Sequence, residues 1–216
     1  MLKKLKKYLS PVSAAAVFCS TFLTLGCGGG SNQAGGGGDG TFGGKAYQKV
    51  ADEGLSGSDQ ELKGSGSVLF KDPLGEVAGE KNISLSFSIE DGGSLTLTAF
   101  SDTKLQNGIK MILTRREKTL SATLEIGTQK TDPRTLSSVD ASGLVTLEID
   151  VHNAETPVHT LIWNQGVASY TSSTAAYDSE ASQMQIQGNG TAPYWGIGLN
   201  KGTLSKATVT EAKFVH

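Results

Sequence analysis

Three polar side chains alternate with apolar ones in the stretch Glu148-Ile149-Asp150-Val151-His152. Successive side chains of a strand point to opposite faces, so an extended stretch places Glu148, Asp150 and His152 on one face. Two carboxyl groups about 5–5.5 Å apart are the nucleophile and the acid/base of retaining glycosidases. The same row would also suit ligand binding on an open sheet face, or the plain solvent side of a strand. The surroundings of the row therefore decide its chemistry.

This stretch resembles the start of the glutamate–X–aspartate–X–(X)–glutamate signature of jelly-roll endoglucanases. The resemblance requires a second glutamate as the acid/base partner. His152 and Asn153 occupy the two positions where that glutamate could lie, and Glu155 is too far along the chain. No catalytic residue is therefore assigned, and Glu148, Asp150 and His152 are predicted to bind a ligand rather than to cleave one.

Aromatic side chains next to polar groups would suit sugar binding. Tyr170 and Tyr177 fall in a polar, serine-rich segment that is typical of a recognition loop. Tyr194 is predicted to lie on the face opposite to Trp195, whereas Trp163 and Trp195 alternate with apolar residues and are predicted to be core. The three tyrosines complete the predicted ligand-binding set, with a covering role at the rim of the domain as the alternative.

Metal-binding signals are weak. The three histidines, His152, His159 and His216, are all more than five residues apart, and no cysteine partner accompanies them. No zinc site is therefore predicted. Calcium takes six to eight oxygen ligands, which single aspartates in separate loops do not by themselves supply. Calcium binding stays an open alternative, with four loop carboxylates as candidates: Asp102, Asp132, Asp140 and Asp178.

About ten short stretches with period-2 alternation follow residue 46, separated by turn residues. Residues 83–90 and 94–100 both alternate, and Asp91-Gly92-Gly93 between them predicts a hairpin turn. Residues 48–62 are the best helical candidate, but Gly54 and Gly57 argue against a helix there. The pattern predicts an all-β domain over residues 46–216, built as an antiparallel two-sheet sandwich.

The order of these elements resembles the concanavalin A-like or laminin G-like jelly roll over roughly residues 65–216. Four stretches carry the resemblance: SLSFSIEDGGSLTLTAFSD, LVTLEIDVHNAETPVHTLIWN, YWGIGLN and SKATVTEAKFVH. Members of this group include lectins, adhesive modules and glycosidases, and loop carboxylates in them often hold calcium. The resemblance therefore implies a fold and a range of functions, not one activity.

The N-terminus has the organisation of a secretory signal. Residues 1–8 carry four lysines, and a short apolar run over residues 14–25 is shorter than the roughly 20 residues that span a bilayer. Gly26-Cys27 resembles the lipobox of bacterial lipoproteins, although Thr24 and Leu25 depart from the family pattern. The resemblance implies cleavage after residue 26 and lipid attachment at Cys27. An ordinary signal peptide is the alternative.

Residues 27–45 are predicted to be a flexible tether, because ten of the 17 residues from 28 to 44 are glycine. Loss of residues 1–26 would remove four lysines and change the net charge from −2 to −6. A mildly acidic chain lacks the positive charge that drives phosphate-backbone binding, so no nucleic-acid partner is predicted.

Together these features predict an exported lipoprotein that a lipid anchor holds to a membrane. Gly28 is not the aspartate that favours inner-membrane retention in the lipoprotein family, so the resemblance implies the outer membrane. The predicted function is non-catalytic binding of a glycan or a protein at the cell envelope. The alternatives are a glycoside hydrolase-like enzyme and a structural envelope protein without a small ligand.

Overall fold

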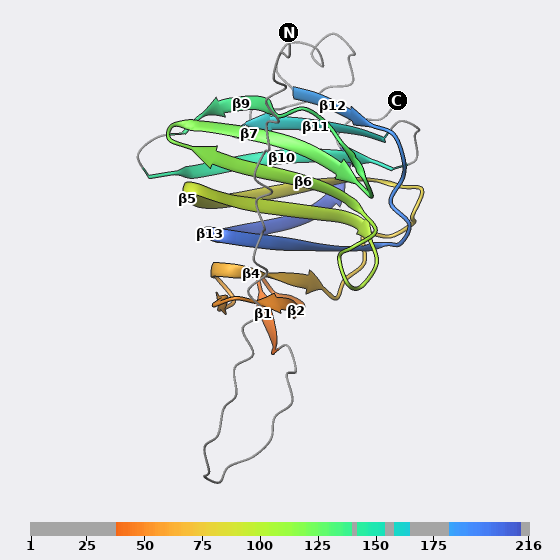
Figure 1. Cartoon of the computed structure of the whole chain (residues 1–216). Coiled ribbons are helices and arrows are strands. Elements are labelled where there is room, and N and C mark those ends of the chain that lie inside the picture. Colours follow the sequence, from red (N-terminus) through yellow and green to blue (C-terminus); the bar gives the residue numbers. More distant parts are fainter. Residues whose placement is uncertain (1–37, 140–141, 154–157, 165–181, 213–216) are drawn as a thin grey trace, which may run out of the picture. The chain divides into compact units, whose positions relative to one another are not determined.

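The computed structural model describes residues 38–139, 142–153, 158–164 and 182–212 (Figure 1). Cys27, Tyr170 and Tyr177 lie outside these ranges. Within them the chain is all-β, no helix is long and apolar enough to cross a bilayer, and neighbouring strands pair antiparallel. The strands of these ranges are β1 Asp39–Phe42, β2 Lys45–Asp52, β3 Ser56–Gly57, β4 Leu62–Phe70, β5 Glu80–Ser101, β6 Ile109–Arg116, β7 Thr119–Ile126, β8 Gln129–Lys130, β9 Arg134–Ser138, β10 Leu144–His152, β11 Val158–Asn164, β12 Ser182–Ile186 and β13 Tyr194–Glu211.

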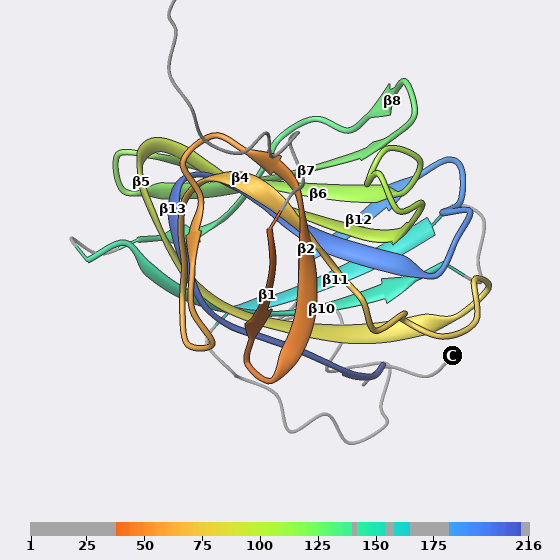
Figure 2. The same ribbon diagram turned by 90° about the horizontal axis from the view of Figure 1, so that it is seen from below.

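Two long strands, β5 and β13, run through both layers of the sandwich (Figure 2). Ser94–Ala99 of β5 pairs with β6, and Glu80–Ser88 pairs with β10. We call the layer of β2, β4, β6, β7 and β9 the front sheet, and that of β10, β11 and β12 the back sheet. Each half of β5 and β13 belongs to one of them. The observed jelly-roll sandwich confirms the predicted fold class.

The hairpin predicted at Asp91-Gly92-Gly93 is wrong. The two stretches that flank it form the single strand β5, which pairs with β6, β10 and β13 and not with itself. Gly92 has φ of +73°, and a Cβ on Gly93 would lie 2.7 Å from the carbonyl oxygen of Asn200. The two glycines therefore let β5 bend against β13 where both strands pass from one sheet to the other.

Alternating apolar residues of both sheets meet in one core, as the period-2 pattern predicts. Leu85, Phe87 and Leu147 are completely buried, and so are Leu113 and Leu124 on the opposite sheet. The prediction that Trp195 is core is confirmed, because its ring stacks on Phe70 at a centroid distance of 4.1 Å. This core gives the outer faces of both sheets a rigid support.

The ordered sheet begins at Asp39, ahead of the predicted boundary at residue 46, so the prediction that residues 39–45 belong to a flexible tether is wrong. Phe42 is the apolar anchor of this segment, since its side chain is 1% exposed and lies 6.4 Å from the Phe70 ring. Asp59 accepts hydrogen bonds from the main-chain N–H groups of Gly43 and Gly44. Burial of one aromatic ring and these bonds offset the entropy lost by ordering glycines.

Substitution of this anchor tests the corrected boundary. Phe42→Ala is expected to lower the free energy of unfolding by about 3–5 kcal/mol, because it empties a filled core position. Denaturant unfolding measures the difference. Thr41→Ala, at the exposed neighbouring position, is the control and is expected to change stability by less than about 0.5 kcal/mol. Equal stability of the two variants would contradict an ordered β1.

Candidate functional site

The predicted polar row lies on the side of β10 that faces away from the core. Asp150 and His152 are completely buried and Glu148 is half-buried. Asn82, the residue opposite Asp150 on β5, donates a hydrogen bond from Nδ2 to Asp150 Oδ1 at 2.6 Å. His152 Nδ1 lies 3.4 Å from Glu80 Oε1. Asp150 is thus held in a buried polar pair, and His152 is buried beside the partly exposed Glu80, so a ligand could reach either residue only after displacing what covers it.

The other predicted ligand-binding residues do not join this row within the described ranges. Tyr194 is half-buried at the start of β13, where it pairs with Ser101 of β5. Tyr170 and Tyr177 belong to a segment outside the described residues. A ligand role for Glu148, Asp150, His152 and the tyrosines therefore stays a prediction.

A shallow cavity of about 350 Å³ lies on the outer face of the front sheet. We call it the sheet-face pocket. Adjacent strands pair in register across its floor, so that Gly198 of β13 lies opposite Thr96 of β5, and Thr96 lies opposite Ile112 of β6. Its residues are Ser67, Thr96, Thr98, Lys104, Leu105, Lys110, Ile112, Glu125 and Gly198.

One wall of the sheet-face pocket is the loop between β5 and β6. The Asp102 carboxylate accepts hydrogen bonds from the main-chain N–H groups of Lys104 and Gln106, at 3.0 and 2.9 Å, and from the Asn107 side chain. Leu105 has φ of +57°, a strained conformation for a leucine, and its side chain lies close against Gly196. The loop is therefore fixed before any ligand arrives.

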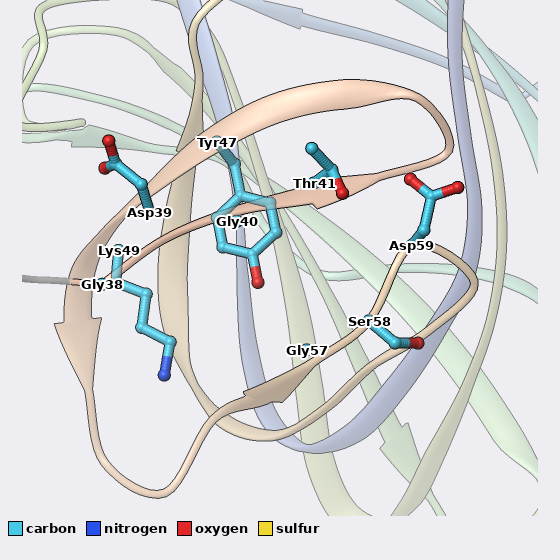
Figure 3. A pocket seen from close by; sticks show the side chains of 9 residues that line it. All are labelled: Gly38, Asp39, Gly40, Thr41, Tyr47, Lys49, Gly57, Ser58 and Asp59. Carbon is cyan, nitrogen blue, oxygen red and sulfur yellow. The ribbon is translucent and has the colours of Figure 1, made fainter.

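A second cavity, of about 340 Å³, lies between β1, β2 and the β3 segment, and we call it the hairpin pocket. Figure 3 shows the Tyr47 ring at its centre, between Gly40 and Gly57, with Lys49 on one side and Asp59 on the other. The Tyr47 side chain is 4% exposed, so it fills this space more than it lines it.

The charged groups of the hairpin pocket are already engaged. Asp39 pairs with Lys71 at 2.7 Å, and Lys49 bonds to Asp52 and to the carbonyl oxygen of Leu55, each at 2.7 Å. Asp59 binds the turn between β1 and β2. These contacts hold the hairpin in place, which indicates a structural role for its polar groups.

The sheet-face pocket differs in this respect. The side chains of Thr96, Thr98, Lys104 and Lys110 form no hydrogen bond or ion pair with any residue that the structure describes, although Thr98 is 4% exposed. Ile112 and Leu105 supply apolar surface beside them. Open hydrogen-bonding capacity next to apolar surface is what a small-molecule site requires. Of the two described pockets, this one is the better candidate.

Sequence reasoning missed this pocket, although part of its signal was present. Thr96, Thr98 and Lys110 are the polar partners of predicted core positions, so their outward direction follows from strand alternation. The strands β4, β13, β5 and β6 lie side by side in the sheet, and no local sequence pattern encodes this order. The left-handed turn at Leu105 was equally hidden.

The described residues offer little to a metal ion. Within the described ranges no three His, Cys, Asp or Glu side chains are grouped as metal ligands. Asp102, one of the calcium candidates, uses its carboxylate to hold its own loop. Asp140 and Asp178 lie outside the described residues, so calcium binding stays a prediction.

No protein-family model matches the chain, and no curated protein matches it. Solved structures do. A carbohydrate-binding module, CBM66 from Bacillus subtilis, is similar at a TM-score of 0.52 and 11% identity, over 76% of this chain and 95% of that one. A legume lectin-like domain from Entamoeba histolytica is similar at 0.52 and 11% identity, over 77% and 90%. At this identity the similarity shows the jelly-roll fold.

The fixed wall of the sheet-face pocket leads to a prediction about pH. The N–H of Gln106, together with those of Lys104 and Asn107, lowers the pKa of Asp102 below its ordinary value of 3.8. A lowered native pKa means that this carboxylate stabilises the fold above pH 3.8, and that the contribution is lost as pH falls through the native pKa.

Asp102→Ala is therefore expected to lower the melting temperature at about pH 7 and to have a smaller effect at about pH 2. Thermal unfolding at both pH values measures this. Thr103→Ala, at an exposed position of the same loop, is the control. An effect of Asp102→Ala that is equal at both pH values would contradict the assigned role.

Proposed function

We propose that this chain is a non-catalytic carbohydrate-binding module and that the glycan binds in the sheet-face pocket. The observation that carries the proposal is the group of four polar side chains, Thr96, Thr98, Lys104 and Lys110, that form no hydrogen bond or ion pair within the described part of the chain and lie next to apolar Ile112. Sugars present hydroxyl groups around an apolar C–H face, so both parts of this surface have a partner. A jelly-roll fold shared with a carbohydrate-binding module and a lectin-like domain supports the proposal.

The hydrolase alternative has less support. Glycoside hydrolysis by Glu148 and Asp150 would need both carboxyl groups to reach the sugar. Asp150 is completely buried and accepts a hydrogen bond from Asn82. A protein ligand in place of a glycan stays the main alternative for the same surface.

Filling the pocket tests the proposal. A Cβ on Gly198 would meet Thr96 Cβ at 3.5 Å and Ser67 Cβ at 3.9 Å, which are ordinary contacts. Gly198→Leu is therefore expected to fold normally and to weaken glycan binding tenfold or more, about 1.4 kcal/mol. A glycan array identifies the ligand, and calorimetry with the best glycan measures the affinity.

Gly38→Leu is the matched control, because Gly38 lines the hairpin pocket and has open space around its Cβ position. It is expected to bind as tightly as the native protein. No binding to any glycan on the array would contradict the proposed function. Binding that Gly198→Leu leaves unchanged, with an unaltered melting temperature, would place the site elsewhere.

We also propose that the exported protein carries lipid on Cys27 and is held at the outer membrane. The lipobox resemblance around Gly26-Cys27 and the basic, then apolar, N-terminus support this. Two or more acyl chains are needed for stable anchoring, as lipoprotein processing supplies.

Cys27→Ala is expected to abolish incorporation of labelled palmitate and to release the protein from the membrane fraction. Cys19→Ala is the control, because Cys19 lies within the predicted signal and is expected to have no effect on labelling. Labelling that persists in Cys27→Ala would contradict lipid attachment at this residue.

A further inference from the structure

We infer that the sheet-face pocket selects glycans that carry a carboxylate, and that Lys104 and Lys110 determine this specificity. The inference rests on the proposed function, because it names the class of glycan that the same pocket takes. A sugar acid such as a uronic acid combines the hydroxyl groups and the apolar face of a neutral sugar with one negative charge.

The lining of the sheet-face pocket contains more positively than negatively charged side chains. Lys104, Lys110 and Glu125 are its charged residues. Glu125 already pairs with Lys130, whose Nζ lies 2.6 Å from Glu125 Oε1 outside the lining. Neither Lys104 nor Lys110 has an ion-pair partner among the described residues. The pocket is therefore locally positive on a chain whose net charge is −2.

Both lysines lie in the lining of the pocket, beside residues with hydrogen-bonding side chains. Lys110 lies on β6 between Thr98 of β5 and Glu125 of β7, which pair with it in register. Its side chain therefore points to the same sheet face as that of Thr98, which is 4% exposed, and that of Glu125. Ammonium–carboxylate hydrogen bonds are stronger than neutral ones, so this face favours an acidic sugar over its neutral counterpart.

The loop that bears Lys104 is ordered before a ligand binds. Lys104 extends from the β5–β6 loop, which Asp102 holds and which Leu105 fixes against Gly196. A further bond from Thr191 Oγ1 to the carbonyl oxygen of Asn107 ties the loop to the segment before β13. Because the main chain of Lys104 is already ordered, binding costs only the ordering of its side chain. Strain at Leu105 is typical of a loop that is fixed for recognition.

A matched pair of ligands tests the inference on the full chain. A trisaccharide of galacturonic acid and its methyl ester differ in charge and have the same sugar hydroxyls. The acid is expected to bind at least fivefold more tightly than the ester. Raising the salt concentration is expected to weaken binding of the acid and to leave binding of the ester nearly unchanged.

Three variants assign the effect to residues. Lys104→Met and Lys110→Met are each expected to weaken binding of the acid about fivefold more than they weaken binding of the ester. Lys110→Arg keeps the charge and is expected to retain the preference. Lys206→Met removes one charge from an exposed position on the back-sheet half of β13 and is the control for net charge.

The outcomes separate the two proposals. Binding of neutral glycans that Gly198→Leu abolishes, with no preference for the acid, would overturn the inference and leave the proposed function standing. A preference for the acid that both lysine variants retain would also overturn the inference. A trisaccharide of neutral sugars that carries a sulfate group and binds more tightly than the uronate would overturn the inference, because the pocket would then select another anion. No binding by any of these glycans or by an array would contradict the proposed function itself.

Discussion

The close approach of β5 and β13 at their common bend is the constraint on which the rest of the domain depends. Gly93 lies so near the carbonyl oxygens of Asn200 and Lys201 that a Cβ would meet them at 2.7 and 2.9 Å. Lys201 takes a positive φ of +54° at the same place. Each strand thereby contributes to both layers, and the two halves of the sandwich share one backbone. The neighbouring β6–β7 turn is tied to this bend, because the N–H of Glu117 donates to Asp91 Oδ1 at 2.6 Å.

The bend determines where polar side chains can gather. On the back sheet the pairing of β5 with β10 brings Asn82 next to Asp150 in a buried pair and the partly exposed Glu80 next to His152. On the front sheet the bend brings β13 between β4 and β5, so the small residue Gly198 leaves a shallow floor. Strand alternation thus gives a buried polar row on the back sheet and, on the front sheet, a pocket whose threonines and lysines have no side-chain partner among the described residues. The proposed glycan site follows from this difference.

Much of the fold could be predicted from the sequence, because alternation is a local property. Leu85, Phe87, Leu147 and Trp195 are all core, as their spacing predicts. Local turn chemistry failed at Asp91-Gly92-Gly93, because the same residues suit a hairpin turn and a bend of one strand. Only the pairing of β5 with β13 decides between them. Phe42 was hidden for a similar reason, since its partner Phe70 is remote in sequence from the glycine-rich segment.

The candidate site was less predictable than the fold. The row of Glu148, Asp150 and His152 was correctly placed on one strand face, but burial depends on what packs over that face. The sheet-face pocket needs four strands and one loop from distant parts of the chain, and the loop conformation rests on three bonds to Asp102. Such tertiary features lie beyond any single-sequence pattern.

Chemical-shift mapping of the main-chain amides during titration with a glycan that binds would locate the glycan site on the sheet. We expect the largest shifts on Thr96, Thr98, Leu105, Lys110 and Gly198, which line the sheet-face pocket. Shifts concentrated at Glu148, Asp150 and His152, or at Tyr47 and Asp59 of the hairpin pocket, would contradict this placement of the site.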